Sequence, residues 1–234
     1  MADTQVTWLG HSAFRIDSPG GKRIYLDPWL GNPKCPEAER TPERVDILAV
    51  SHGHGDHVGE AVELGKQHAP KVVAIFELAN WLERQGVPGA SDLGMNKGGT
   101  VEVEGVKFTM TDALHSGGFI GDDGSITYLG DPAGFVIELE NGTKVYFAGD
   151  TTVFGDMQLI GRIYQPDVAV LPIGDQFTMS PKEAAVALEL LAVDTCIPCH
   201  YGTFPLLSGT PDELRKLAPN VDVLSPEPGE TIEV

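Results

Sequence analysis

Three histidines and one aspartate fall within six consecutive residues of the chain, in the segment His52-Gly53-His54-Gly55-Asp56-His57. A mainly apolar run over residues 46–51 leads into this segment, as a buried strand leads into a turn. Imidazole and carboxylate together suit divalent ions such as zinc, manganese or iron. The alternative is a polar surface turn, but the two glycines supply the backbone freedom needed to aim several side chains at one point. The segment therefore predicts a metal site.

Four further side chains that bind metals follow apolar runs elsewhere in the chain, namely His115, Asp150, Asp175 and His200. An α/β scaffold assembles a site from remote residues when several strands deliver His or Asp to one edge of a sheet. Taken alone, each histidine would more often be a core or surface residue, and Asp150 would serve as a helix cap. Because the first cluster is present, we expect these residues to converge on it.

The elements that position these residues begin with β-structure. Apolar and polar residues alternate over residues 4–9, 13–17 and 22–27, which predicts an antiparallel meander. A Pro-rich loop spans residues 32–42, and the strand into the histidine segment comes next. A helix over about residues 58–68 and a strand over residues 71–75 are expected to follow. Helix and strand then alternate.

The second half repeats the pattern. A hairpin is expected over about residues 101–111, and two strands over residues 134–140 and 143–149 are joined by the hairpin signal Asn141-Gly142. A short strand over residues 168–171 precedes a helix that starts with the capping box Ser180 to Glu183, and the next strand covers residues 195–200. The Gly-rich stretch over residues 116–130 has no clear periodicity, so we expect either a mobile wall over the cleft or an ordinary solvated loop.

Composition limits the class of protein and its partners. A chain of 234 residues is long enough for one domain, so we expect a single unit over residues 1–234. The formal net charge of -18 disfavours nucleic acid, whereas a small-molecule substrate remains compatible, and self-association is left open. No basic leader precedes an apolar stretch and no run is long enough to span a membrane. Three cysteines are poor material for disulfides, which favours a reducing cytoplasm.

The order of the candidate ligands resembles a known pattern. His52-x-His54-x-Asp56-His57, then His115, Asp150 and His200, is similar to the ligand pattern of the metallo-β-lactamase superfamily. Five stretches look more specifically like its metal-dependent hydrolase branch, similar to the ascorbate-6-phosphate lactonases: residues 8–12, 149–151, 171–175, 177–179 and 200–205. The resemblance implies an α/β fold, the four-layer αβ/βα sandwich, with a two-metal site at the edge of the paired sheets.

The resemblance also implies a division of the ligands. His52, His54 and His115 would hold one divalent ion, Asp56, His57 and His200 the other, and Asp150 would bridge them. We expect zinc at both positions, with manganese, iron or nickel as the other candidates. Two such ions about 3.5 to 4 Å apart lower the pKa of a shared water and polarise the oxygen under attack. The expected reaction is therefore hydrolysis of a small ester, lactone or phosphate-containing substrate, with Asp56 orienting the attacking hydroxide.

Further residues are candidates around the ligands. Asp27 resembles the superfamily's acid that accepts a hydrogen bond from a ligand, although Asp before Pro also favours a turn. His11 lies in a Gly-His-Ser turn and is predicted to act on the substrate as a proton donor, with a structural histidine as the alternative. Asp175 and Thr178 are expected near the site. His68 is expected to be an exposed residue at a helix end.

The segment from Cys196 to His200 matches the haem-attachment pattern C-x-x-C-H, but it is apolar and strand-like, and His200 is already used as a ligand. Extended, it would place Cys196 and His200 on one face and Cys199 on the other.

Competing functions share the ligands. A phosphodiesterase or nuclease of the same superfamily is the second enzyme hypothesis, and the acidic charge with no basic insert opposes it. A di-iron redox protein or a non-catalytic metal-binding protein is the third. The redox members of the superfamily normally carry a flavodoxin-like domain after the sandwich, and this sequence is expected to end near the end of the sandwich.

Overall fold

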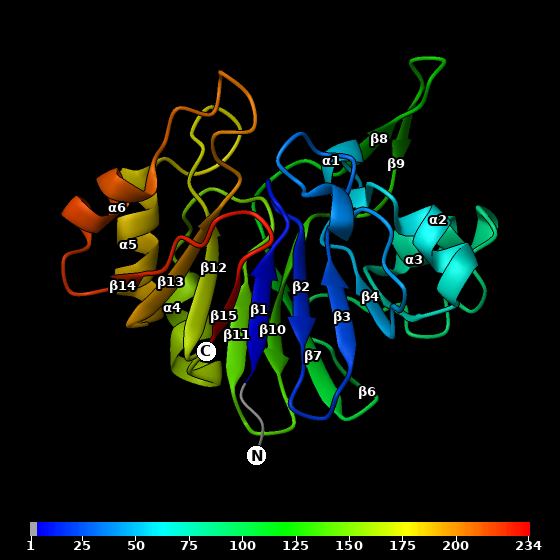
Figure 1. The fold of residues 1–234 in the computed structure, drawn as a ribbon, viewed down its shortest axis with the longest axis horizontal. Helices are drawn as coiled ribbons and strands as arrows, with labels where there is room; N and C mark the ends of the chain where they lie inside the picture. The colour runs from blue at the N-terminus through cyan, green and yellow to red at the C-terminus, as the bar shows by residue number, and fades with distance from the viewer. Residues whose placement is uncertain (1–3) are drawn as a thin grey trace.

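Two β-sheets pack face to face in the computed structural model, which describes residues 4–234, and helices cover the outer sides (Figure 1). The first sheet has the order β15 (Thr231–Glu233), β1 (Gln5–Trp8), β2 (Phe14–Asp17), β3 (Arg23–Leu26), β4 (Ile47–Ala49) and β5 (Lys71–Val73). The second has the order β14 (Asp222–Val223), β13 (Thr195–Cys199), β12 (Val168–Pro172), β11 (Lys144–Phe147), β10 (Ala133–Glu138), β7 (Val106–Asp112) and β6 (Thr100–Val103).

The helices form two groups at opposite ends of the paired sheets (Figure 1). On the side of β4 and β5 lie α1 (Gly55–Val58), α2 (Ala61–His68) and α3 (Phe76–Arg84), and on the side of β11 to β13 lie α4 (Met157–Tyr164), α5 (Pro181–Leu191) and α6 (Pro211–Leu217). A short 3-10 turn covers Glu37–Glu39. None of the helices formed by residues 4–234 has the length and apolar character of a membrane span.

Apolar residues on both faces of the strands explain the layers. Phe147 of β11 packs edge to face against Phe14 of β2, with ring centroids 6.1 Å apart, in the core between the sheets. Its neighbour Tyr146 points the other way and joins the buried cluster formed with α4 and α5. Because successive residues of a strand face opposite sides, one short apolar run serves both layers. The αβ/βα sandwich expected from the sequence is confirmed.

Most of the expected elements form. The first three strands are an antiparallel meander, with Val6 opposite Ile16 and Arg15 opposite Tyr25. The turn at Asn141-Gly142 connects β10 to β11 in the register Glu138 to Lys144, and Gly142 has the positive φ of 90° that such a turn requires. The helix α5 starts with the capping box that the sequence predicts, Ser180 with Glu183 and Pro181 in the first turn.

Two predictions need correction. The helix expected over about residues 58–68 forms as α2 but begins only at Ala61, because Gly59, which follows the short helix α1, has φ of +44° and lies so close to the backbone of Trp29 that a Cβ would be 2.3 Å from the Trp29 Cα. The stretch over residues 116–130 is not irregular, because it contains the hairpin of β8 (Gly118–Ile120) and β9 (Ile126–Tyr128). Phe119 anchors this hairpin on Trp81 of α3, with ring centroids 5.1 Å apart.

The strand directions bring the candidate residues to one edge. In the first sheet β1, β3 and β4 run the same way, because β1 and β3 are both antiparallel to β2 and β4 is parallel to β3. In the second sheet β7, β11, β12 and β13 share a direction by the same reasoning. The carboxyl ends of these strands are where α/β folds bind ligands.

Candidate metal centre

The seven predicted ligands lie together at the carboxyl ends of β4, β7, β11 and β13. Six of the seven, together with His11, fall into two groups in which one donor atom of each residue lies within 4.8 Å of the others, and a further set, Asp27, His52 and His57, overlaps both groups. We call His52, His54 and His115 the first group, and His11, Asp56, His57 and His200 the second group. The division matches the one that the family resemblance implies, with His11 added to the second group.

Asp150 lies between the two groups. Its Oδ2 atom is 3.2 Å from His57 Nε2, 3.2 Å from His200 Nε2 and 3.6 Å from His115 Nε2. The side chain is buried, and the neighbouring histidines outweigh the effect of burial and hold the pKa of this carboxyl well below its usual value. Asp150 therefore presents a permanent negative charge to both groups.

In the first group, hydrogen bonds determine which nitrogen of His52 and of His54 carries the proton. Ser51 Oγ donates to Asp27 Oδ2 over 2.6 Å, so at 2.9 Å from His52 Nδ1 it accepts the proton of that nitrogen. His52 Nε2 is left without a proton and lies 3.0 Å from His54 Nδ1, while His54 Nε2 is 3.3 Å from Ser116 Oγ. Burial lowers the pKa of His52 and His54, which favours the neutral rings that metal binding requires.

In the second group, His57 lies between two carboxylates. Its Nδ1 donates to Asp27 Oδ2 over 2.7 Å, which leaves Nε2 facing Asp150. Burial by itself lowers the pKa of His57, but Asp150 and Asp27 raise it well above the ordinary value. Asp27 also accepts the backbone N–H of Ser51 on Oδ1, so its oxygens are occupied by hydrogen bonds. Asp27 thus connects to the first group through Ser51 and to the second through His57.

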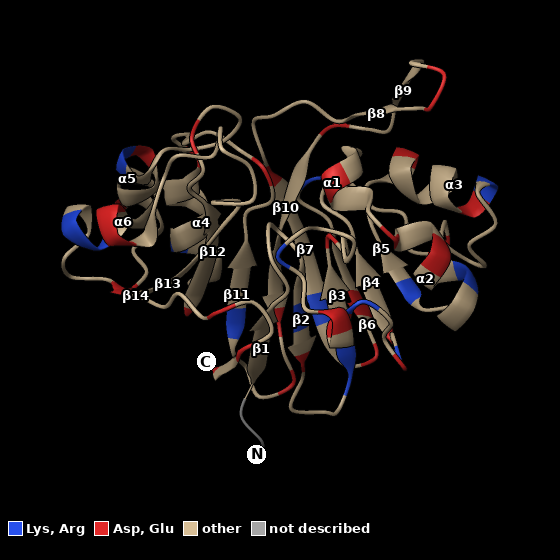
Figure 2. Cartoon of the chain, turned by 45° about the horizontal axis from the view of Figure 1, so that its top comes forward, with Lys and Arg blue, Asp and Glu red and all other residues tan. Residues whose placement is uncertain are grey.

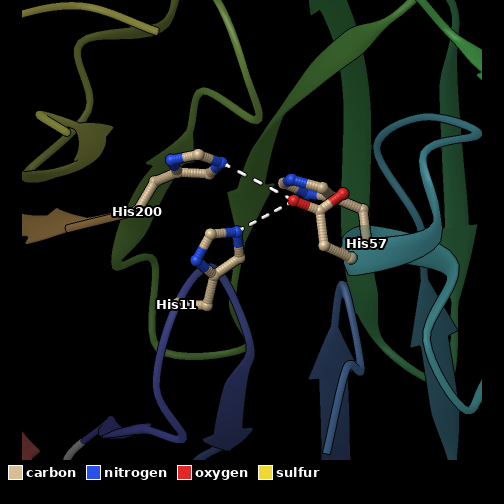
Figure 3. Close-up of side chains that lie close together, drawn as sticks. His11, His57 and His200 are labelled. Atoms are coloured by element: carbon tan, nitrogen blue, oxygen red, sulfur yellow. Dashed lines mark hydrogen bonds and ion pairs between the residues drawn. The ribbon is translucent and has the colours of Figure 1, made fainter. Parts of the chain in front are cut away.

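His11 is fully buried and contacts Asp56 rather than the open cavity. Its Nε2 lies 3.1 Å from Asp56 Oδ2, and its Nδ1 lies 3.0 Å from Thr203 Oγ1. Figure 3 shows His11 and His200 approaching one carboxylate oxygen beside His57, and the His200 Nε2 to Asp56 Oδ2 distance is 3.9 Å. Burial lowers the pKa of His11 to about 4, so the ring is neutral near pH 7.

The partners of His11 settle its tautomer. A carboxylate only accepts hydrogen bonds, so Nε2 carries the proton and Nδ1 accepts from the Thr203 hydroxyl. Burial alone would raise the pKa of Asp56, but the hydrogen bond from His11 and the charge of His57 lower it. The structure therefore places His11 behind Asp56, whereas the sequence predicts that it contacts the substrate.

The donor atoms fit divalent metal ions. Among residues 4–234, the buried Asp150 Oδ1 finds no hydrogen-bond partner, and the buried His57 Nε2 has only the Asp150 carboxylate beside it, at 3.2 Å. Leaving buried polar atoms unpaired costs free energy, and in proteins such atoms are normally paired or bound to a metal. Neutral imidazole nitrogens together with carboxylates are the ligand set of zinc and of neighbouring first-row ions.

Backbone strain concentrates at the same place. His11, Asp27 and His200 have φ values of 53°, 44° and 55°, in the left-handed region that costs a residue with a side chain about 1 to 3 kcal/mol. The N–H of His200 donates to the carbonyl oxygen of His11 over 2.9 Å, which ties the end of β13 to the turn after β1. Both sheets therefore contribute a strained residue to one junction.

A cavity of about 430 Å³ opens over the centre. Its lining combines donors of both groups with apolar side chains: His54, Asp56, His115, Ser116, Asp150, His200, Phe177, Phe204 and Leu206. This volume lies in the range of small-molecule sites.

Asp175 and Thr178, expected near the site, do not line its cavity. Asp175 is exposed and borders a different hollow with Ser180 at the start of α5, and Thr178 is half-buried. Residues 175 and 176 both adopt left-handed backbone, with φ of 66° and 51°, and this turn directs Phe177 into the cavity instead. Asp175 and Thr178 are thus not among the residues that line the cavity, and their role near the site stays a prediction.

Other sequence expectations can be compared with the structure. His68 lies in the last turn of α2, as expected, but it is half-buried rather than exposed. All three cysteines are free and buried, and Cys196 and Cys199 pack into different core clusters on opposite faces of β13, as the extended segment predicts.

Two hydroxyl groups that orient histidines of the site, those of Ser51 and Thr203, were not predicted from the sequence. Ser51 stands directly before the histidine segment, and Thr203 stands three positions after His200. A hydroxyl next to a ligand cluster is a weak signal, because serine and threonine are also common in ordinary turns.

Comparisons with known proteins agree with this geometry. A family model described as the β-lactamase superfamily domain matches residues 22–201. A UPF0173 metal-dependent hydrolase of Koribacter versatilis is 47% identical over 97% of this chain and 97% of its own length, and one of Herpetosiphon aurantiacus is 49% identical over 98% of each. Igni18, a metallo hydrolase from the archaeon Ignicoccus hospitalis, is 33% identical, with a TM-score of 0.86 over 100% of this chain and 99% of that one.

A four-layer sandwich with a His/Asp centre at its edge defines a metal-dependent hydrolase of the metallo-β-lactamase type. Within that superfamily, the chain belongs to the UPF0173 metal-dependent hydrolases. The superfamily, the fold and the enzyme class that the sequence predicts are confirmed, and the hydrolase class is favoured over the redox and the non-catalytic alternatives.

Proposed function

We propose that the chain hydrolyses a small ester or a related acyl compound at a centre of two divalent metal ions, with zinc as the first candidate. His52, His54 and His115 would hold one ion, and Asp56, His57 and His200 the other, with Asp150 shared. When bound, the two ions would polarise the substrate oxygen and lower the pKa of the attacking water.

One observation carries this proposal. Asp150 Oδ2 lies within 3.6 Å of histidine nitrogens from both groups, so one carboxylate can serve two ions without a change in the fold. The other oxygen of this carboxylate, Oδ1, is buried and has no hydrogen-bond partner, so it is free to bind an ion.

The protein side chains have separable roles in the reaction. Asp56 lines the cavity and stays ionised, so it can accept a hydrogen bond from the attacking water and orient it. His11 is a positioning residue, because its Nε2–H holds the Asp56 carboxylate in place from a buried position. Asp27 orients His57 through Nδ1 and, through Ser51, orients His52.

The partner that we propose is a small molecule. A net charge of -18 repels polyanions, and nucleic-acid affinity arises mainly from contacts between cationic side chains and phosphates. Retention of RNA by the purified protein in a gel, at moderate salt, would instead support the nuclease hypothesis.

The test is a substrate screen with defined metal loading. Protein loaded with zinc, manganese or nickel is assayed on carboxylic esters, lactones, thioesters and phosphodiesters, beside the variants Asp150→Asn and Asp194→Asn. Asp194 is exposed and lies outside the site, so the second variant controls for the loss of one charge. We expect hydrolysis of at least one acyl ester by the wild type. Its kcat/KM should fall by at least about a hundredfold in Asp150→Asn and stay unchanged in Asp194→Asn. Unchanged turnover in Asp150→Asn would overturn the proposal.

A further inference from the structure

Three large apolar side chains stand beside the metal-binding residues. Phe177, Phe204 and Leu206 line the cavity, and 49%, 38% and 55% of their respective surfaces are exposed. We call these three residues the apolar wall. A cluster of large apolar side chains on the surface usually marks a binding site, because exposing such side chains to water is unfavourable in free energy.

Phe204, one residue of the wall, is held by aromatic contacts. The ring of Phe204 stacks on Trp29 with centroids 5.9 Å apart, and its edge contacts His11 at 5.7 Å. The preceding residue, Thr203, donates its hydroxyl to His11 Nδ1. His11 therefore contacts both Phe204 and Asp56. Through these contacts it fixes the position of the Phe204 ring relative to the Asp56 carboxylate.

The loops that carry the wall are joined to each other. The N–H of Gly209 contacts the carbonyl oxygen of Gly174 at 3.4 Å, and a Cβ on Gly174 would lie 2.1 Å from the carbonyl oxygen of His200. The loop with Phe177 thus packs directly against the residue that supplies a metal donor. A substrate in the cavity would contact both the apolar wall and the metal-binding groups, because both line it.

The charged residues around the cavity define what the wall can accept. Within the described range, 4–234, no Lys or Arg lines the cavity, whereas Asp56 and Asp150 do. Figure 2 shows Lys and Arg mainly on the outer helices and on strands such as β2, β3 and β11. An anionic group at the far end of a substrate would lose its water without gaining a cationic partner, which is unfavourable.

We propose that the substrate presents an uncharged apolar acyl or alkyl group to Phe177, Phe204 and Leu206. This inference rests on the proposed function and narrows it, since it excludes metabolites that carry a phosphate or carboxylate remote from the bond that is cut. Leu206 and Phe177 are the residues that determine the length of the accepted group, because they are more exposed than Phe204 and line the same cavity.

The experiment varies the far end of the substrate and keeps the reacting group constant. The metal-loaded enzyme is assayed on the 4-nitrophenyl esters of acetic and hexanoic acid and on the mono-4-nitrophenyl ester of adipic acid. Each buried methylene contributes about a fourfold gain, so we expect kcat/KM for the hexanoate to exceed that for the acetate by roughly tenfold or more. The far end of the adipate ester is a carboxylate, so its kcat/KM should be lower than that of the hexanoate by at least about tenfold.

Variants of the wall have matched controls. Leu206→Ser and Phe177→Ala should reduce the preference for hexanoate over acetate by about threefold to tenfold. Leu217→Ser and Phe76→Ala alter side chains of similar exposure away from the cavity and should leave the preference unchanged. Equal kcat/KM for acetate and hexanoate, or faster cleavage of the adipate ester, would overturn the inference.

Binding without turnover separates this inference from the proposed function. Hexanamide and adipic monoamide differ only by the terminal carboxylate, and their binding to the metal-loaded protein can be followed by ligand-observed NMR. Weaker binding of hexanamide to Leu206→Ser than to Leu217→Ser supports the wall even if no ester is hydrolysed, in which case the proposed ester hydrolysis alone fails. Tighter binding of adipic monoamide than of hexanamide would overturn the inference that the wall binds an uncharged apolar group. It would not contradict the proposed ester hydrolysis.

Discussion

Asp27 Oδ2 accepts a hydrogen bond from His57 Nδ1 over 2.7 Å and another from the Ser51 hydroxyl over 2.6 Å. Through His57 it orients a donor of the second group, and through Ser51 and His52 it orients a donor of the first. One buried carboxylate thus fixes the tautomers of two histidines that face different groups. Loss of a partner of this kind typically lowers metal affinity by about ten- to a hundredfold.

Replacing Asp27 with Asn should weaken both parts of the centre. Asn tolerates the left-handed backbone at this position, and its side chain has nearly the same shape. The Ser51 hydroxyl and His57 Nδ1 both donate hydrogen bonds to the Asp27 carboxylate, and an amide oxygen accepts such bonds more weakly than a carboxylate does. We therefore expect zinc affinity to fall by about ten- to a hundredfold. Competition with a coloured chelator measures the change. Exposed Asp112→Asn is the control, and equal affinity in both variants would contradict the role given to Asp27.

Metal binding should release protons. In the metal-free protein Asp150 and Asp27 raise the pKa of His57 well above its ordinary value despite burial, so the ring is protonated at neutral pH. An ion that takes Nε2 must displace that proton, and its apparent affinity therefore falls as the pH is lowered. Calorimetric titration with zinc in two buffers of different ionisation enthalpy counts the protons, and we expect about one from His57 near pH 7. A count of zero would show that His57 is neutral before the ion binds.

The sequence predicted the ligands better than their surroundings. His52 to His57 are close in sequence, and the other ligands each follow an apolar strand, so their convergence follows from strand direction alone. The break at Gly59 was not predictable, because it results from the close approach of Trp29, a residue about thirty positions away in the sequence. Phe204 was likewise missed, since its position depends on contacts with Trp29 and His11 that exist only in the folded chain.

Gly59 offers a test of how the ligand turn is held. A Cβ at this position would lie 2.3 Å from Trp29 Cα and 2.5 Å from the Pro28 carbonyl oxygen, and backbone atoms cannot move aside as a flexible side chain can. Gly59→Ala should destabilise the protein by about 3 kcal/mol or more. Gly155→Ala, where nothing lies within 4 Å, should change stability by less than about 0.5 kcal/mol. Urea denaturation compares them, and similar midpoints would show that the turn is not tightly packed.

The three thiols should react slowly in the native protein. Burial raises the pKa of Cys35 to about 11 and also raises the pKa values of Cys196 and Cys199. The thiolate is the reactive form, so at pH 8 only about one Cys35 thiol in a thousand is ionised, and its reaction should accelerate as the pH rises toward 11. A thiol-specific disulfide reagent should label no cysteine quickly until denaturant is added, and then all three. Rapid labelling of a native thiol at pH 8 would contradict the burial.

The number of metal ions in the purified protein tests the central claim most directly. Elemental analysis by mass spectrometry after dialysis, with hydrolysis measured on the same samples, compares the wild type with Asp150→Asn and Asp194→Asn. We predict two divalent ions per chain in the wild type and in Asp194→Asn, with fewer than two and a parallel loss of hydrolysis in Asp150→Asn. Wild-type protein that hydrolyses its substrate with one ion or none would contradict the two-metal account.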